Sequence, residues 1–277
     1  MSSIVRLTGN DHEMVSKYIY HNFWGCIEIA KVFDKNGLRN VISDKNAGTF
    51  LGFMNDEGLL EGLFVFTNNK RFLLHFKNDD VTKKVDLLKA VKHFKPDFMS
   101  GPKGQVEKVW QMFERTVKRY KYSNSMYMVL DKHDLEETPL VREASLMDAK
   151  KQIKFLLEIE KSFKRNHMTI NQMQKRIEER VHTGEYLVVE DQERLVAQGF
   201  VEDKIQAFSQ IGGIYTSSDY RKKGYAKMIV SALCAEILSK GNIPILAVMS
   251  DNASAISVYE SLGFVRTIDF SIIEIEF

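Results

Sequence analysis

The sequence predicts a mixed α/β fold of the α+β class, with helices flanking mixed β-sheets. Two observations support this prediction. Short apolar runs alternate with segments whose apolar residues recur at helical spacing, and a similar order of elements occurs in both halves of the chain. The length of 277 residues and the hydrophobic content of 44% allow one large or two ordinary globular domains.

The second half gives the clearer alternation. In the segment 148–163, apolar residues recur at roughly helical spacing, and the turn Asp191–Arg194 between two apolar runs predicts a hairpin. A later helix stops at Lys240-Gly241, a terminal charge followed by glycine. We expect strands over 140–144, 185–190, 195–202, 207–215, 243–249 and 264–277, and helices over 148–163, 170–181, 224–240 and 253–262.

The first half has the same kind of pattern with weaker signals. The polar, charged stretch Asp131–Pro139 has the composition of a linker, so we predict domains over 1–133 and 140–277 joined by residues 134–139. In the first domain we expect helices over 11–33, 81–94 and 104–113, and strands over 49–54, 59–67, 72–76, 97–100 and 122–131.

The stretch Tyr215–Ala226 has the layout of a phosphate-binding turn. An apolar strand passes through a polar turn into a basic, glycine-containing segment, and a helix follows directly. A helix start presents unpaired N–H groups at the positive end of its dipole, and glycine there lets the main chain approach a pyrophosphate. Arg221, Gly224 and Ala226 fit the pattern Arg/Gln-x-x-Gly-x-Gly/Ala. The alternative is an ordinary surface turn.

A second motif follows at the next strand and helix. The strand over 243–249 ends just before Asn252, and the following helix carries Ala255 and Tyr259 before it closes at Gly263-Phe264. Together, the two motifs resemble the coenzyme A signatures of the GNAT superfamily of N-acetyltransferases. The resemblance covers residues 138–277 well and the first half only by the order of its elements.

The resemblance implies tandem GNAT folds, each with a mixed sheet that is splayed between its two central strands. It also implies that the second domain binds acetyl-CoA as co-substrate, with pantetheine along the strand end and pyrophosphate at the helix start. The residues expected to bind it are Ile214, Tyr215, Thr216, Arg221, Lys222, Lys223, Gly224, Tyr225, Ala226, Asn252 and Tyr259.

Acetyl transfer to an amine needs alignment, a neutral amine and a proton for the leaving thiolate. The resemblance implies that Tyr259 donates this proton to the thiolate. Tyr259 could instead be a core aromatic packed against the Gly263-Phe264 turn. Asn252 would hold pantetheine or cap the next helix, and the two roles can coexist. Glu202, beside Asp203 at a strand end, is the candidate general base, although such carboxylates are commonly surface groups.

The first half offers no comparable turn. Between the strand 72–76 and the helix 81–94 it has Lys77-Asn78-Asp79-Asp80, whose two carboxylates would repel a pyrophosphate and suit a helix cap. We interpret Gly101-Pro102-Lys103-Gly104 as a structural turn, because proline removes an N–H donor. By the resemblance, this half is a related domain that has lost its coenzyme site.

Composition narrows the classes of partner. The formal net charge of +2 gives no case for nucleic-acid binding. The sequence has no signal-peptide core or membrane-length apolar run, so we expect a cytoplasmic protein that does not enter a membrane. Cys26 and Cys234 are expected to be buried free thiols. The spacing of histidines indicates no metal site.

We therefore expect an acetyl-CoA-dependent N-acetyltransferase that moves the acetyl group directly to a primary amine of a small molecule or peptide. The alternative is a non-catalytic acyl-CoA-binding regulatory or interaction protein on the same fold, and the first half could be an interaction module. Amine acceptor, acyl length and pairing into a homodimer are left open by the sequence.

Overall fold

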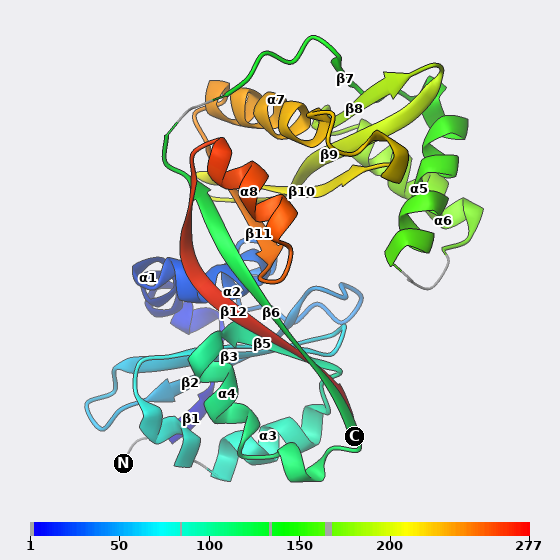
Figure 1. The fold of residues 1–277 in the computed structure, drawn as a ribbon. Coiled ribbons are helices and arrows are strands. Elements are labelled where there is room, and N and C mark those ends of the chain that lie inside the picture. The colour runs from blue at the N-terminus through cyan, green and yellow to red at the C-terminus, as the bar shows by residue number, and fades with distance from the viewer. Residues whose placement is uncertain (1–2, 84, 133–134, 164–167) are drawn as a thin grey trace. The chain divides into compact units, whose positions relative to one another are not determined.

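The computed structural model describes residues 3–83, 85–132, 135–163 and 168–277 (Figure 1). The chain divides into two compact units. The first comprises Met1–Tyr127, Met249–Asp251 and Thr267–Phe277, and the second comprises Met128–Val248 and Asn252–Arg266. The domain boundary predicted at residues 133 and 134 lies outside the described residues.

The first unit is built on a mixed sheet. Its strands follow the order β1-β2-β3-β4-β5-β12, and neighbours are antiparallel except for the parallel pair β4 and β5. In chain order the elements are β1 (Ser3–Arg6), α1 (His12–His21), α2 (Phe23–Asn36), β2 (Gly48–Met54), β3 (Leu60–Thr67), β4 (Arg71–Phe76), α3 (Val85–Phe94), β5 (Phe98–Pro102), α4 (Lys103–Trp110) and the larger parts of β6 (Arg119–Leu130) and of the C-terminal strand β12 (Phe264–Glu276).

Alternate residues of β4 face opposite sides of this sheet, as the pleat requires. Phe76 joins a buried cluster with Val91 of α3 and Val109 of α4. His75 points to the other side, where its Nδ1 lies 2.9 Å from the Tyr18 hydroxyl of α1. Burial lowers the pKa of His75 to about 4, so this imidazole is neutral at pH 7 and acts as a core group.

The second unit repeats the mixed arrangement. Its strand order is β7-β8-β9-β10-β11, antiparallel throughout except for the parallel pair β10 and β11. The elements are β7 (Val141–Glu143), α5 (Ala149–Phe163), α6 (Ile170–Val181), β8 (Tyr186–Asp191), β9 (Arg194–Ile205), β10 (Phe208–Thr216), α7 (Tyr225–Ser239), β11 (Ile243–Met249) and α8 (Ala253–Ser261).

Helices cover both faces of the second sheet (Figure 1). On one face, a Cβ built on Gly199 of β9 would lie 2.6 Å from Ile229 of α7, so that helix packs directly against the strand. On the other face, the Tyr215 ring of β10 packs against Phe155 of α5 with centroids 5.5 Å apart. The sheet is therefore enclosed by α7 on one side and α5 on the other.

Several predicted elements differ in extent from those observed. The hairpin turn at Asp191–Arg194 is confirmed, with β8 and β9 paired across it. The single helix predicted over 11–33 is wrong, because it is divided at Asn22, whose side-chain amide donates to the Tyr18 carbonyl at 2.7 Å and competes with the helical hydrogen bonds. The helix predicted over 81–94 begins with a 3-10 turn over Asp79–Lys83, and β1 was not predicted.

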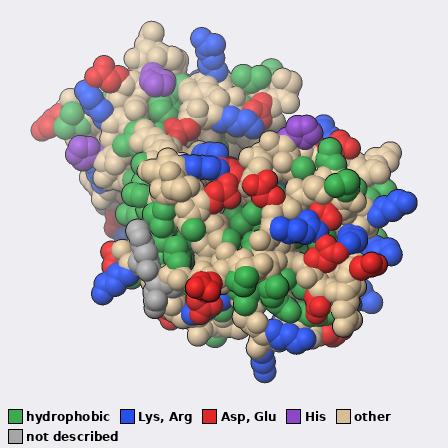
Figure 2. Space-filling view, turned by 90° about the horizontal axis from the view of Figure 1, so that it is seen from above, with side chains coloured by type: hydrophobic (Ala, Val, Ile, Leu, Met, Phe, Trp, Pro, Cys, Tyr) green, Lys and Arg blue, Asp and Glu red, His purple; other side chains and the backbone are tan. Residues whose placement is uncertain are grey.

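The state of the two thiols and the distribution of surface charge agree with what the composition predicts. Cys26 and Cys234 are free and buried, as predicted. On the face seen in Figure 2, Lys and Arg side chains are interspersed with Asp and Glu rather than gathered in a field of one sign. Among the described residues, no helix combines the length and apolar character needed to span a membrane.

Candidate active site in the second unit

The parallel strands β10 and β11 separate part of the way along their length. Their pairing runs from Phe208 with Ile243 to Ile211 with Leu246, whereas β10 stays paired with β9 as far as Thr216. In the described structure, residues 212–216 therefore have β9 on one side and no paired residue of β11 on the other. Backbone groups on such an edge can be completed by a ligand.

A β-bulge lies within this open part of β10. The register with β9 shifts between Gly212 and Tyr215. Gly213 has φ +63°, and a Cβ at this position would lie 1.8 Å from the Phe200 ring, so the bulge requires glycine. The Gln198 side-chain amide donates to the Gly213 carbonyl at 3.3 Å and fixes the bulge.

Three predicted coenzyme-binding residues, Ile214, Tyr215 and Thr216, lie within the bulge or directly after it. Ile214 lies on the α7 side of the sheet, whereas the Tyr215 hydroxyl lies 2.7 Å from that of Ser162 in α5. The Tyr215 side chain is thus engaged with α5, and its backbone lies on the open edge. The hydroxyls of Thr216 and Ser217 are buried without a hydrogen-bond partner in the described chain, which leaves two polar groups that a ligand can satisfy.

The start of α7 is open to an anion. Its N-cap is Gly224, with φ 82°, and no side chain caps the helix. The first helical hydrogen bond runs from the Met228 N–H to the Gly224 carbonyl, so the N–H groups of residues 225–227 precede the helical ladder. Because these donors lie at the positive end of the helix dipole, they can bind a phosphate group.

Three cations flank this helix start. Arg221, Lys222 and Lys223 are exposed, and none of them forms an ion pair with another described residue. The Arg221 Nε donates to the Thr216 carbonyl at 3.2 Å, and the Lys223 ammonium lies 4.8 Å from the Tyr220 ring centroid. The positive charge therefore lies beside the end of β10, and no carboxylate of the described residues forms an ion pair with it.

Helix α8 places the second motif. Asn252 is its N-cap and accepts a hydrogen bond from the Ala255 N–H at 3.2 Å. The Tyr259 side chain is buried with its ring centroid 6.0 Å from that of Phe264, and burial raises its pKa to about 12. Its hydroxyl makes no hydrogen bond to any residue that the structure describes. The ring thus packs in the core while the hydroxyl remains available.

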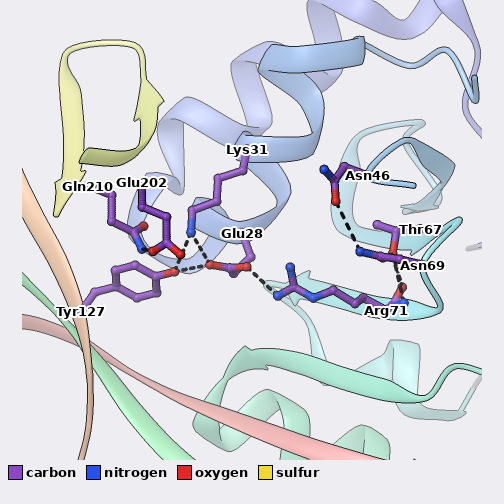
Figure 3. Close-up of polar contacts among 9 residues, drawn as sticks. All are labelled: Glu28, Lys31, Asn46, Thr67, Asn69, Arg71, Tyr127, Glu202 and Gln210. Carbon is purple, nitrogen blue, oxygen red and sulfur yellow. Dashed lines mark hydrogen bonds and ion pairs between the residues drawn. The ribbon is translucent and has the colours of Figure 1, made fainter. Parts of the chain in front are cut away.

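The Glu202 side chain of β9 lies beside Gly212 of β10. It is exposed on β9 and accepts a hydrogen bond from the Gln210 side-chain amide at 3.0 Å (Figure 3). Within the described chain, no hydrogen bond joins it to Tyr259 or to residues 221–226. Gln210 itself is buried, and its Oε1 has no partner in the described chain. Sequence inspection did not single out Gln210, because neither its type nor its spacing matches a motif.

The corresponding strand end in the first unit is closed. The parallel pairing of β4 and β5 ends at Leu73 and Ser100. Beyond it, the Gln105 side chain of α4 donates to the Phe76 carbonyl at 2.8 Å and accepts from the Phe76 N–H at 2.9 Å. A side-chain carboxamide of the same unit therefore completes both backbone groups that would otherwise be available to a ligand.

The turn after β4 also differs from the turn after β10. Asn78 accepts a hydrogen bond from the Asp80 N–H at 2.9 Å, and Asp79 forms an ion pair with Lys108. The segment has no glycine. Acidic side chains thus occupy the region where the second unit has three cations.

The first unit contains a polar cluster that the sequence did not reveal (Figure 3). Glu28 of α2 accepts from Lys31 and from Arg71 of β4, each at 2.7 Å, and from the Tyr127 hydroxyl of β6. Burial alone would raise the pKa of Glu28, but the two cations hold it below its usual value. The cluster links three elements. No three His, Cys, Asp or Glu side chains in the described ranges are grouped as metal ligands would be.

Residues 187–270 match the FR47-like protein family. No curated protein matches the sequence. An acetyltransferase of the GNAT family from Colwellia psychrerythraea is 13% identical, with a TM-score of 0.59 and 99% of both chains covered. A GCN5-related N-acetyltransferase from Sphaerobacter thermophilus is 11% identical, with a TM-score of 0.63, 98% of this chain covered and 94% of that chain.

A tandem GNAT protein from the clavulanic acid biosynthesis pathway is 13% identical, with a TM-score of 0.54, 99% of this chain covered and 97% of that chain. At these identities the likeness concerns the fold, and it extends over the whole chain. The family match and the structural likeness together show that this chain, which divides into two compact units, has the GNAT fold.

Proposed function

We propose that the second unit binds acetyl-CoA and transfers its acetyl group to a primary amine. The observation that carries the proposal is the contrast between two similar strand ends. In the second unit β10 is no longer paired with β11 beyond Ile211, and it leads to an uncapped, basic helix start. In the first unit Gln105 completes the strand end, and acidic side chains occupy the turn.

The residues present fit the chemistry of the coenzyme. The N–H groups of residues 225–227, with Arg221, Lys222 and Lys223, would hold the pyrophosphate. The backbone of residues 214–216 would pair with the amides of pantetheine, and the buried Thr216 hydroxyl gives a further polar contact. Asn252 would act mainly as the helix cap that positions α8.

Acetyl-CoA would supply the acetyl group as an activated thioester. The amine nitrogen forms a bond to the acetyl carbonyl carbon while the carbon–sulfur bond breaks, so the amine loses one proton and the thiolate gains one. Tyr259 would donate the proton to sulfur, because a pKa of about 12 keeps its phenol protonated at neutral pH. Glu202 would accept the amine proton, directly or through water.

The test compares charge removal at the helix start with matched charge removal elsewhere. Lys222→Gln/Lys223→Gln removes two exposed cations at the proposed pyrophosphate site, and Lys150→Gln/Lys154→Gln removes two exposed cations from α5. Each charge-assisted contact contributes about 1 kcal/mol or more, so we expect the acetyl-CoA Kd to rise at least about tenfold in the first variant only.

Calorimetric titration with acetyl-CoA measures both variants, and thiol release in the presence of amines measures transfer. Wild-type protein that gives no binding heat and no thermal shift would refute the proposal. Equal loss of affinity in the two variants would place the coenzyme elsewhere.

A further inference from the structure

An arginine whose side chain has aromatic neighbours but no hydrogen bond or ion pair within the described chain lies next to the open part of β10. Arg180 stands near the end of α6, with its guanidinium carbon 3.6 Å from the centroid of the Phe200 ring. It is half-buried and forms no hydrogen bond or ion pair with any residue in the described ranges. Burial lowers its pKa to about 10, which leaves it charged at pH 7. A desolvated, unpaired cation is costly unless an anion reaches it.

The position of Arg180 connects it to the proposed acetyl site. The ring on which it lies, Phe200, packs directly over Gly213, at the bulge where β10 leaves β11. Arg180 therefore lies over the face of β10 that α5 and α6 cover. The open edge of this strand would hold the acetyl donor. The neighbouring charges that act on it are Arg176 of the same helix and Glu202 of β9.

A carboxylate and an unsatisfied acceptor lie on the same face. Gly212 of β10 is paired with Phe200, and a Cβ on Gly212 would lie 2.7 Å from the Glu202 Oε2, so Phe200 and Glu202 both lie beside this residue. Gln210 donates to Glu202, while its own Oε1 is buried without a partner in the described chain. Glu202 and Arg180 attract one another without forming an ion pair within 4 Å. This face thus has a cation at one side and two acceptor groups at the other.

We propose that the acceptor amine carries a carboxylate, as an amino acid does. This inference rests on the proposed function and names its substrate class. The Arg180 fork binds the carboxylate through paired N–H donors, and the Gln210 Oε1 accepts a hydrogen bond from the amine. Glu202 takes the proton that the amine loses on transfer. A ligand with both charges would pair with Arg180 through its carboxylate and with Glu202 through its amine.

The first experiment compares acids with their carboxamides. Glycine, β-alanine, L-alanine, L-phenylalanine and L-glutamine are assayed beside the corresponding amides, in which the carboxylate is replaced by a neutral group. Thiol release gives kcat and KM, and thermal melts with each compound in the presence of desulfo-CoA report binding without turnover. We expect at least one acid to be preferred over its amide by about 10- to 100-fold in kcat/KM, as a charge-assisted interaction predicts.

Variants then assign that preference to one residue. Arg180→Gln should raise the KM for the preferred acid by about 10- to 100-fold and leave the KM for its amide unchanged. Arg180→Lys should recover part of the loss, because it keeps the charge without the planar fork. Lys175→Gln is the matched control, since it removes an exposed cation from the same helix. Unchanged acetyl-CoA affinity would show that the Arg180 variants are folded.

The outcomes separate this inference from the proposed function. If the protein binds acetyl-CoA and acetylates only amines that lack a carboxylate, or acetylates acids and amides equally, the acceptor class is wrong while the function stands. The same conclusion follows if no amino acid is bound or acetylated, or if Arg180→Gln leaves the KM of the preferred acid unchanged. A protein that does not bind acetyl-CoA refutes the proposed function itself.

Discussion

Replacing Ala255 with glutamine tests whether one side chain decides if a strand end can bind coenzyme. Ala255 is the third residue of α8, and Gln105 is the third residue of α4, the helix at the same place in the order of elements of the first unit. In the first unit, the Gln105 carboxamide bonds both the N–H and the carbonyl of Phe76. We expect Ala255→Gln to supply a similar carboxamide to the open end of β10.

The expected magnitude comes from the two hydrogen bonds that Gln105 makes. Each net hydrogen bond contributes about 0.5–1.5 kcal/mol, so competition for two backbone groups weakens binding by about 1–3 kcal/mol. This range corresponds to an acetyl-CoA Kd that is about 5- to 150-fold higher. At a ligand concentration of about 100 times the wild-type Kd, stabilisation by ligand should fall from about 2.7 kcal/mol to between about 0.3 and 1.8 kcal/mol.

Calorimetric titration gives the Kd, and thermal melts without ligand show whether the variant is folded. Ser257→Gln is the matched control, because it places the same side chain at an exposed position two residues along α8. Gln105→Ala should leave the wild-type Kd unchanged. A folded Ala255→Gln protein with wild-type affinity would refute the reasoning, and so would an equal loss of affinity in Ser257→Gln.

Three other substitutions have defined outcomes. Tyr259→Phe should lower kcat by about 100-fold at unchanged acetyl-CoA affinity, because it removes the proposed acid, and unchanged kcat would favour a non-catalytic coenzyme-binding protein. Asp148→Asn should destabilise the fold by about 1–2 kcal/mol at pH 7. The hydrogen bonds from Arg142 lower the pKa of Asp148 to about 2. The stability that the Asp148 carboxylate contributes is therefore present above about pH 4 and is lost as the pH falls toward about 2. Urea melts in which the difference in unfolding free energy between wild type and variant is the same at pH 7 and pH 2 would contradict this. Glu28→Gln should cost about 2–3 kcal/mol in the same assay, because Lys31 and Arg71 lose their shared carboxylate, and a change under about 0.5 kcal/mol would show that the cluster is not stabilising.

The sequence could predict elements whose pattern is local. The hairpin at Asp191–Arg194 follows from a polar turn between two apolar runs, and α7 follows from helical spacing that ends in glycine. The GNAT fold could be predicted because its motifs combine a strand end, a turn and a helix start within a few residues. The roles assigned to Tyr259 and to the basic turn remain predictions.

Other features depend on contacts between distant segments, which no local pattern encodes. The C-terminal strand β12 pairs with β5, residue Phe270 with Pro102, although the two are far apart in the chain. Glu28 meets Arg71 and Tyr127 only because α2, β4 and β6 converge in the first unit. Arg180 looked like any other charge on a polar helix, and only the packing of α6 against Phe200 shows that it is half-buried and unpaired.

The two units show how one order of elements can serve different ends. Both have a parallel strand pair followed by a helix, and both pairs stop before the strand ends. What differs is the side chain available at that point: counted from the helix start, Gln105 and Val109 in α4 stand where Ala255 and Tyr259 stand in α8. A glutamine that completes the backbone and a buried valine favour a closed, structural strand end. An alanine that leaves the backbone open, and a tyrosine whose hydroxyl has no partner among the described residues, would favour a ligand. If the proposed function holds, a few side chains, rather than the fold, determine which unit can act.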